Sequence, residues 1–176
     1  MIDNKIKEDV KKKTLKIYKK AHIYLTDKEK ENIEYVDLGL NDIYNIGLQI
    51  VIYVNTERVC AKELCLLPYQ TCPEHKHPPI DGKPGKEETF RVRYGKMYLY
   101  VPGEKSEVIH ARVPENYKFL NFHEIELNVG DEYTIYPETW HWFQAGKDGC
   151  VVSEFSTKSV DEKDVFSDET MVRVGK

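Results

Sequence analysis

The sequence predicts a mainly β protein, a barrel or sandwich preceded by a short helical segment. Segments rich in Val, Ile, Tyr, Phe and Leu recur at short intervals, each bounded by Gly, Pro, Asn or Asp. Such spacing is typical of all-β sandwiches and barrels. We expect a hairpin turn at Tyr94-Gly95-Lys96, and strands over residues 48–55, 59–67, 89–101, 121–127, 132–136 and 150–157.

The first part of the chain has the pattern of an amphipathic helix. Residues 5–21 carry apolar side chains at helical spacing between lysines, at Ile6, Val10, Ile17 and Ala21. Thr26 and Glu29 have the spacing of a capping box, which predicts a second short helix ending near residue 34. Acidic residues interrupt the basic cluster of the first helix, so we interpret that cluster as a solvated face.

The length of the chain predicts one domain. A domain typically takes about 100–200 residues, and this chain has 176. Within a single domain over residues 1–176, we expect a helical segment over 1–35, a barrel over 36–158 and a C-terminal strap over 159–176.

Composition and charge exclude several classes of protein. Hydrophobic residues make up 40% and charged residues 32% of the chain, which is too apolar for an intrinsically disordered protein. The net charge is −4 with both signs mixed along the chain, so we expect no nucleic-acid partner. No apolar run approaches the roughly 20 residues of a membrane span, and the first residues are too charged for a signal peptide. We therefore expect a cytoplasmic protein with no membrane partner.

The four cysteines, Cys60, Cys65, Cys72 and Cys150, contain no C-x-x-C pair. In a chain of this length without an export signal, reduced thiols are expected. Cys60, Cys65 and Cys150 lie in apolar stretches, where we expect them to act as small core residues.

A set of three histidines and one acid has the pattern of a metal site. His75 and His77 are two residues apart, so an extended strand would direct both imidazoles to one face. Glu88 opens the next predicted strand, and His141 follows the turn that begins at Pro137. Three imidazoles and one carboxylate, without sulfur, suit Mn, Fe, Co, Ni or Zn. The competing interpretation of the H-x-H pair alone is two surface histidines. We expect His22, His110 and His123 to be surface residues or polar residues with satisfied hydrogen bonds.

The order H-x-H, a spacer, E-x6-G and a proline turn before a late His resembles the cupin superfamily. His75, His77, Glu88 and Gly95 match its first motif, and Gly130, Pro137 and His141 match its second. The spacer of ten residues after His77 is longer than in other cupins, and the second motif is one residue shorter. The resemblance implies a jelly-roll barrel and, by analogy with other cupins, a homodimer.

Over residues 15–166 the chain resembles the small bacterial D-lyxose isomerases. The likeness rests on the run TCPEHKHPP-DG–GK-ETFR-RYGK-YLYV, with KEL upstream and HWFQAG downstream. It implies a divalent metal, usually Mn²⁺, held by the four residues of the motif. It also implies interconversion of D-lyxose and D-xylulose, with weaker action on D-mannose and D-fructose.

Isomerisation through an enediol requires a group that moves the proton, in addition to the metal ligands. Glu154 and Lys62 are charged residues inside apolar predicted strands, where an unpaired charge is costly. They also match the strand contexts of the Glu and Lys that the resembled family is thought to use. We predict Glu154 as the group that moves the proton and Lys62 as its assistant at the sugar oxygens, with Glu63 on the opposite face.

Several other residues stay open as contacts of the substrate. We expect Glu74 on the strand face opposite His75, Arg91 and Arg93 in solvent or in cross-strand pairs, and Trp142 and Phe143 in the core, with one ring available to line the pocket. Three alternative functions also remain: an iron oxygenase, a non-catalytic sugar-binding cupin, and a phosphosugar isomerase with phosphate held by Arg91, Arg93 and Lys96.

Overall fold

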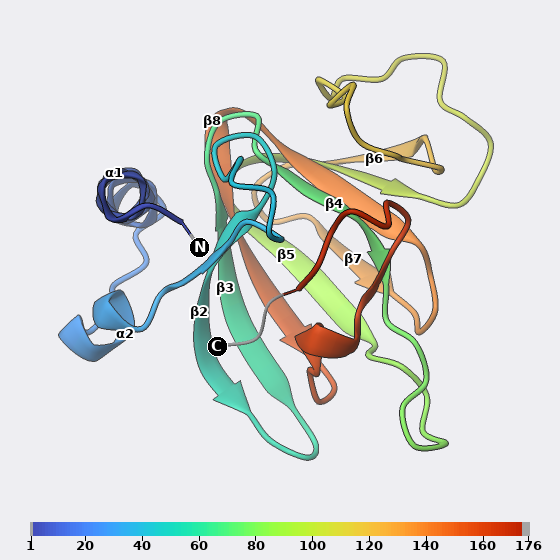
Figure 1. Ribbon diagram of the computed structural model, residues 1–176, viewed down its shortest axis with the longest axis horizontal. Helices are drawn as coiled ribbons and strands as arrows, with labels where there is room; N and C mark the ends of the chain where they lie inside the picture. Colours follow the sequence, from blue (N-terminus) through green and yellow to red (C-terminus); the bar gives the residue numbers. More distant parts are fainter. Residues whose placement is uncertain (1, 174–176) are drawn as a thin grey trace.

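The computed structural model describes residues 2–173 and shows a curled sheet with a helix packed on its outer face (Figure 1). The strands within these residues are β1 Glu34–Val36, β2 Leu48–Asn55, β3 Cys60–Leu66, β4 Thr71–Lys76, β5 Glu88–Val101, β6 His123–Leu127, β7 Glu132–Ile135, β8 His141–Ser156 and β9 Val165–Phe166. They join in the order β1-β2-β3-β8-β4-β9, while β5 pairs with β6, β7 and β8. The predicted mainly β architecture with an N-terminal helix is confirmed.

The curled sheet forms a cup, whose two sides are connected by the two long strands β5 and β8. The C-terminal half of β8 pairs with β3 and with the first half of β5, and its N-terminal half pairs with β4 and the second half of β5. Both strands bend where their register shifts near Gly95. Residues from distant parts of the sequence therefore meet inside the cup.

The hairpin turn predicted at Tyr94-Gly95-Lys96 is wrong, because β5 continues through these residues. Gly95 has a φ of +71°, and a Cβ atom there would lie 2.0 Å from the carbonyl oxygen of Gly149 in β8. The glycine thus permits a close approach of two paired strands at a bend, which the sequence pattern does not distinguish from a turn.

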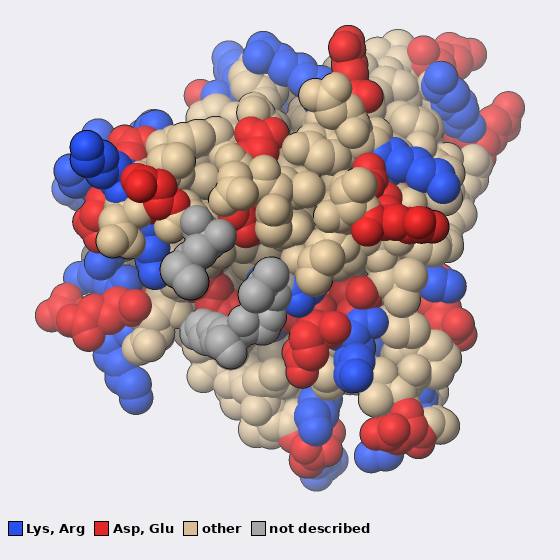
Figure 2. Space-filling model, viewed as in Figure 1, with Lys and Arg blue, Asp and Glu red and all other residues tan. Residues whose placement is uncertain are grey.

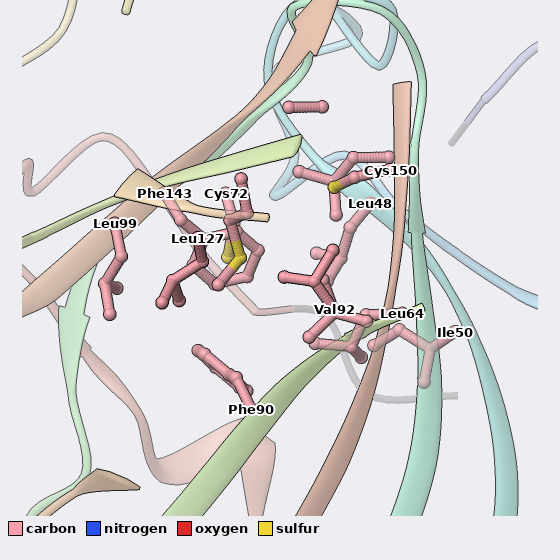
Figure 3. Packing of buried hydrophobic residues seen from close by; sticks show 14 of the residues in the cluster. Leu48, Ile50, Leu64, Cys72, Phe90, Val92, Leu99, Leu127, Phe143 and Cys150 are labelled. Atoms are coloured by element: carbon pink, nitrogen blue, oxygen red, sulfur yellow. The ribbon is translucent and has the colours of Figure 1, made fainter. Parts of the chain in front are cut away.

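The main hydrophobic core fills the interior of the cup beside the cavity described below. Figure 3 shows side chains from the strands gathering in this space, among them Leu64, Val92 and Phe90. The rings of Phe90 and Phe143 meet edge to face, with centroids 5.2 Å apart. This packing holds β5 and β8 in the positions from which they supply the site.

The helix α1 (Asn4–Lys20) packs Val10, Ile17 and Tyr18 against the outer face of the sheet. A second short helix, α2 (Asp27–Glu31), begins with the predicted capping box: the Glu29 N–H donates to Thr26 Oγ1 at 3.2 Å, and the Thr26 N–H donates to Glu29 Oε2 at 2.7 Å. It ends before the predicted residue 34, because β1 begins there.

All four cysteines lie within the described residues, buried and unbridged. Acidic and basic side chains are interspersed over the face shown in Figure 2.

Among residues 2–173, no helix combines the length and apolar character needed to span a membrane. The predicted strap is described up to residue 173 and contains a short 3-10 helix, η1 (Asp161–Lys163), and β9; residues 174–176 lie outside the described part.

Candidate metal centre

The four predicted metal ligands come together inside the cup. His75, His77, Glu88 and His141 are all buried, and each offers a ligand atom within 4.8 Å of those of the others. β4 and β8 pair His75 with His141, so these imidazoles lie side by side with ring centroids 4.3 Å apart. Glu88 enters from the first residue of β5. Separate strand ends therefore supply one compact group.

Each of the three imidazoles is held through its Nδ1 atom. The Nδ1–H of His75 donates to the Pro73 carbonyl at 2.8 Å, and that of His141 donates to the Thr139 carbonyl at 2.9 Å. The Nδ1–H of His77 donates to the Asp164 carboxylate at 2.6 Å. Because carbonyl and carboxylate oxygens only accept, these contacts assign the proton to Nδ1 and direct each Nε2 toward the centre. Such outer contacts fix ring orientation in metal sites.

At the centre of the group, two ring nitrogens converge on one oxygen of Glu88. Glu88 Oε1 lies 3.0 Å from Nε2 of His141 and 3.2 Å from Nε2 of His77, which can donate a hydrogen bond to it. His141 Nε2 is buried without a hydrogen-bond partner, as expected when a lone pair faces a carboxylate oxygen. Buried acceptors that face one another require a donor or a cation. The donor set of three nitrogens and one carboxylate fits a divalent cation.

Burial and neighbouring charges shift the pKa values of two of the imidazoles in opposite directions. Burial lowers the pKa of His75 well below its ordinary value, with help from the other two imidazoles, so His75 is neutral and ready to bind a metal. Burial and Lys86 also oppose a charge on His77, but Glu88 and Asp164 outweigh them and raise its pKa to about 9. A metal ion must therefore displace a proton from His77.

The two predicted catalytic side chains line the same cavity. Lys62 in β3 and Glu154 in β8 are paired in register and buried, with Nζ 3.7 Å from Oε1. Glu63 lies on the other face, as expected, where its carboxylate accepts a hydrogen bond from Ser153 at 2.6 Å. The structure thus brings Lys62 and Glu154 beside the metal group.

Sequence reasoning missed Lys86, which connects the ligand group to the predicted catalytic pair. Its Nζ atom lies 2.6 Å from Glu88 Oε2 and 3.1 Å from Glu154 Oε1, and its side chain is buried. Burial opposes this charge, but Glu154 and Glu88 outweigh it and raise the pKa of Lys86 well above its ordinary value. A usable signal existed: Lys86 lies two residues before Glu88, so an extended chain would direct both side chains to one side.

The C-terminal segment also contributes residues that were not predicted. Asp161 accepts hydrogen bonds from Lys62 Nζ at 2.9 and 2.8 Å, and Asp164 holds His77. Arg173 pairs with Glu34 of β1 at 3.0 Å and with Asp161 at 3.5 Å. No local sequence pattern marks these residues, because only the path of the strap brings them to the cavity.

The remaining candidates lie elsewhere. Glu74 is buried, but its carboxylate accepts the N–H groups of Leu120 and Asn121 and so anchors a loop. Arg91 pairs with Glu132 on the surface, and Arg93 is exposed. Trp142 stacks on a tyrosine in the core, and Phe143 lines the cavity.

His22, His110 and His123 lie outside the ligand group, as expected. His110, which is exposed, contacts Glu124, and His123, which is half-buried, contacts a backbone carbonyl.

Comparison with known proteins identifies close relatives. The chain is 57% identical over 173 residues to D-lyxose/D-mannose isomerase of Thermosediminibacter oceani, covering 97% of this chain and 95% of the relative. It is 51% identical to D-lyxose ketol-isomerase of a Thermofilum species and 49% identical to that of Cohnella laeviribosi, with at least 92% of every chain covered. No protein-family model matches the chain.

Solved structures support the fold. The L-ribose isomerase of Cellulomonas parahominis superposes with a TM-score of 0.68 at 15% identity, covering 97% of this chain and 94% of that one. The L-ribose isomerase of an Acinetobacter species superposes with a TM-score of 0.63 at 17% identity, covering 90% of this chain and 82% of that one. With the near full-length identity to the curated relatives, these findings show that the chain belongs to the D-lyxose isomerase family and is a sugar isomerase with a cupin fold.

Proposed function

We propose that this aldose–ketose isomerase depends on a divalent metal and interconverts D-lyxose and D-xylulose, acting more weakly on D-mannose and D-fructose. The names of the three close relatives support the substrates. One observation supports the chemistry above all: a buried carboxylate, Glu154, lies beside two buried ammonium groups, those of Lys62 and Lys86, next to the histidine–glutamate group. Buried charges of this kind are costly unless they are paired or used in the reaction.

We propose Mn²⁺ as the native metal, held by His75, His77, Glu88 and His141. When bound, the cation would supply Lewis-acid stabilisation of the oxygen on which negative charge develops, an effect of several kcal/mol. Fe, Co, Ni and Zn also suit this donor set, and the choice among them depends on geometry and supply as much as on ligand type.

Glu154 is proposed to move the proton between C2 and C1 of the open-chain sugar. Its carboxylate accepts the proton from one carbon and returns it to the other through an enediol, a role worth about 10²–10⁴-fold in rate. Lys86, 3.1 Å from Glu154 Oε1, holds this carboxylate in position. Lys62 lies on the other side of Glu154, where its ammonium can donate to a sugar oxygen as charge develops.

The positions of the residues considered for a phosphate favour a free sugar over a sugar phosphate as substrate. Arg91 and Arg93, the residues considered for phosphate, are exposed outside the cup, and Lys96 is paired with Glu126. None of the three lines the cavity, as far as the described residues show. The alternatives of an iron oxygenase and of a non-catalytic sugar-binding cupin have no comparable support, because the close relatives are named as isomerases.

The proposal is tested by incubating the purified protein with Mn²⁺ and D-lyxose and measuring D-xylulose. We expect turnover of D-lyxose, slower turnover of D-mannose, and none of the corresponding sugar phosphates. Turnover restricted to phosphorylated sugars, or oxygen consumption without ketose, would contradict the proposal. The homodimer, the cytoplasmic location and the single-domain organisation stay predictions; sedimentation of the purified protein tests the first.

A further inference from the structure

The cavity beside the metal group is small. Its volume is about 50 Å³. One water molecule needs about 10–15 Å³ of such space, so the cavity has room for a few waters and not for a five-carbon sugar. All four ligand side chains are buried as well. A sugar can reach this site only if part of the covering structure moves.

The cover on one side is the segment from Ser159 to Arg173, which we call the strap. Figure 1 shows it in red, following β8 across the open side of the curled sheet. Three side chains of the strap bind site residues directly: Ser159 and Asp161 accept hydrogen bonds from Lys62, and Asp164 accepts one from His77. A fourth, Phe166, lies against His75 with ring centroids 5.8 Å apart.

A larger groove lies directly outside this cover. It has a volume of about 640 Å³ and runs along β1 and the strap. Val36, Asp161 and Arg173 line both the groove and the inner cavity, so these side chains form the partition between the two spaces. Arg173 is held there by Glu34 at 3.0 Å and by Asp161 at 3.5 Å.

The strap is attached mainly through polar contacts. β9 pairs with β4 at two residue pairs only. Among the described strap residues, Met171 is the one buried apolar side chain, and further anchors are the backbone N–H groups of Ser167 and Val172, which donate to carbonyls of Glu74 and Leu38. Segments with few buried apolar contacts open at lower free energy than core strands.

We propose that the strap is a moving part of the active site, which opens between the outer groove and the cavity to admit the sugar. The Arg173 contacts with Glu34 and Asp161 form its latch. In the closed state Asp161 accepts hydrogen bonds from the ammonium of Lys62, and Asp164 orients the imidazole of His77. Closure therefore completes the site. The role in sugar admission rests on the proposed function, but the opening itself does not.

Hydrogen–deuterium exchange of the full chain measures the opening without any sugar. We expect the amides of Ser167 and Val172 to exchange at least about 100-fold faster than those of β8, because local opening exposes the first and only global unfolding exposes the second. Glu34→Gln weakens the latch and should speed strap exchange about two- to fivefold without changing β8. The control is Glu57→Gln, which removes an exposed pair with Lys158 outside the strap and should change neither rate.

A reversible lock tests admission of the sugar. Lys76 and Val165 are directly paired between β4 and β9, so the double variant Lys76→Cys/Val165→Cys places two thiols within reach of a disulfide, while the native cysteines stay buried. The rate at which the oxidised variant binds a linear pentitol should be at least about tenfold lower than that of the reduced variant. The time course of heat release in a calorimeter measures this rate.

Two results would overturn the proposal. One is that the strap amides exchange as slowly as those of β8, and the other is that the oxidised and reduced variants bind the pentitol at equal rates. If the wild-type protein neither binds nor isomerises a pentose, the proposed function fails, while the exchange rates still decide whether the strap opens.

Discussion

Lys62 and Glu154 face each other across paired strands, with the ammonium 3.7 Å from the carboxylate and both side chains buried. This pair lies next to the group of three histidines and Glu88, and Lys86 bridges the two. The account of the reaction depends on this arrangement, because it places a charged proton acceptor beside a site for a cation.

Glu154→Gln keeps the shape of the side chain but removes its ability to accept a proton. We expect kcat on D-lyxose to fall by about 10²–10⁴-fold while bound metal stays unchanged. Glu132→Gln, at the exposed pair with Arg91, is the control and should retain activity. A Glu154→Gln enzyme with more than a tenth of the wild-type rate would assign the proton transfer to another group.

Lys86→Met removes the cation between two buried carboxylates. Because the carboxylates of Glu88 and Glu154 then lose their close partner, we expect the free energy of unfolding to fall by about 3–5 kcal/mol. Urea denaturation of the metal-free protein measures this change. The control is Lys96→Met, at an exposed pair with Glu126, which should change the free energy of unfolding far less. Equal effects of the two substitutions would mean that Lys86 is not the central cation of the cavity.

Gly95→Ala tests the close approach of β5 and β8. The new methyl group would meet the Gly149 carbonyl, so we expect a loss of at least about 3 kcal/mol in unfolding free energy. Gly82→Ala is a matched control, because Gly82 also has a positive φ but a Cβ there meets no atom within 4 Å. That substitution should cost about 1–2 kcal/mol from backbone strain alone. Thermal unfolding of both variants separates the clash from the strain.

The metal-free protein should lose stability as the pH rises. The pKa of His77 is about 9 in the fold, above its value of about 6.5 in the unfolded chain. The stabilisation is therefore complete below pH 6.5 and is lost as the pH rises toward 9, by up to about 3 kcal/mol. Urea denaturation of EDTA-treated protein at several pH values tests this. His77→Gln should remove the slope, and a slope that persists in this variant would assign it to other groups.

The sequence alone was sufficient for the parts of this protein that follow local rules. The strands β2, β3, β5, β6, β7 and the second half of β8 follow from runs of β-branched and aromatic residues, and the capping box at Thr26 follows from its spacing. His75, His77, Glu88 and His141 were identified together because residue type and order were both restrictive. The alternation of strand faces predicts that Lys62 and Glu63 point to opposite faces, and the structure confirms that placement.

The parts that were missed depend on tertiary structure. Gly95 suggested a turn, because a local pattern does not show that β5 bends against β8 at that residue. Asp161 and Asp164 lie in a polar tail of ordinary composition and reach the site only because β9 pairs with β4. Lys86 is different, since its position two residues before Glu88 was a readable signal in the sequence.

The central claim is that one divalent cation, held by the three imidazoles and Glu88, is required for turnover. The most direct measurement combines elemental analysis with activity on D-lyxose, for protein stripped with EDTA and for the same protein after Mn²⁺ is returned. We expect no D-xylulose from the stripped protein, and recovered activity that rises in proportion to bound Mn²⁺ up to one ion per chain. Undiminished formation of D-xylulose by protein shown to be free of metal would contradict the account.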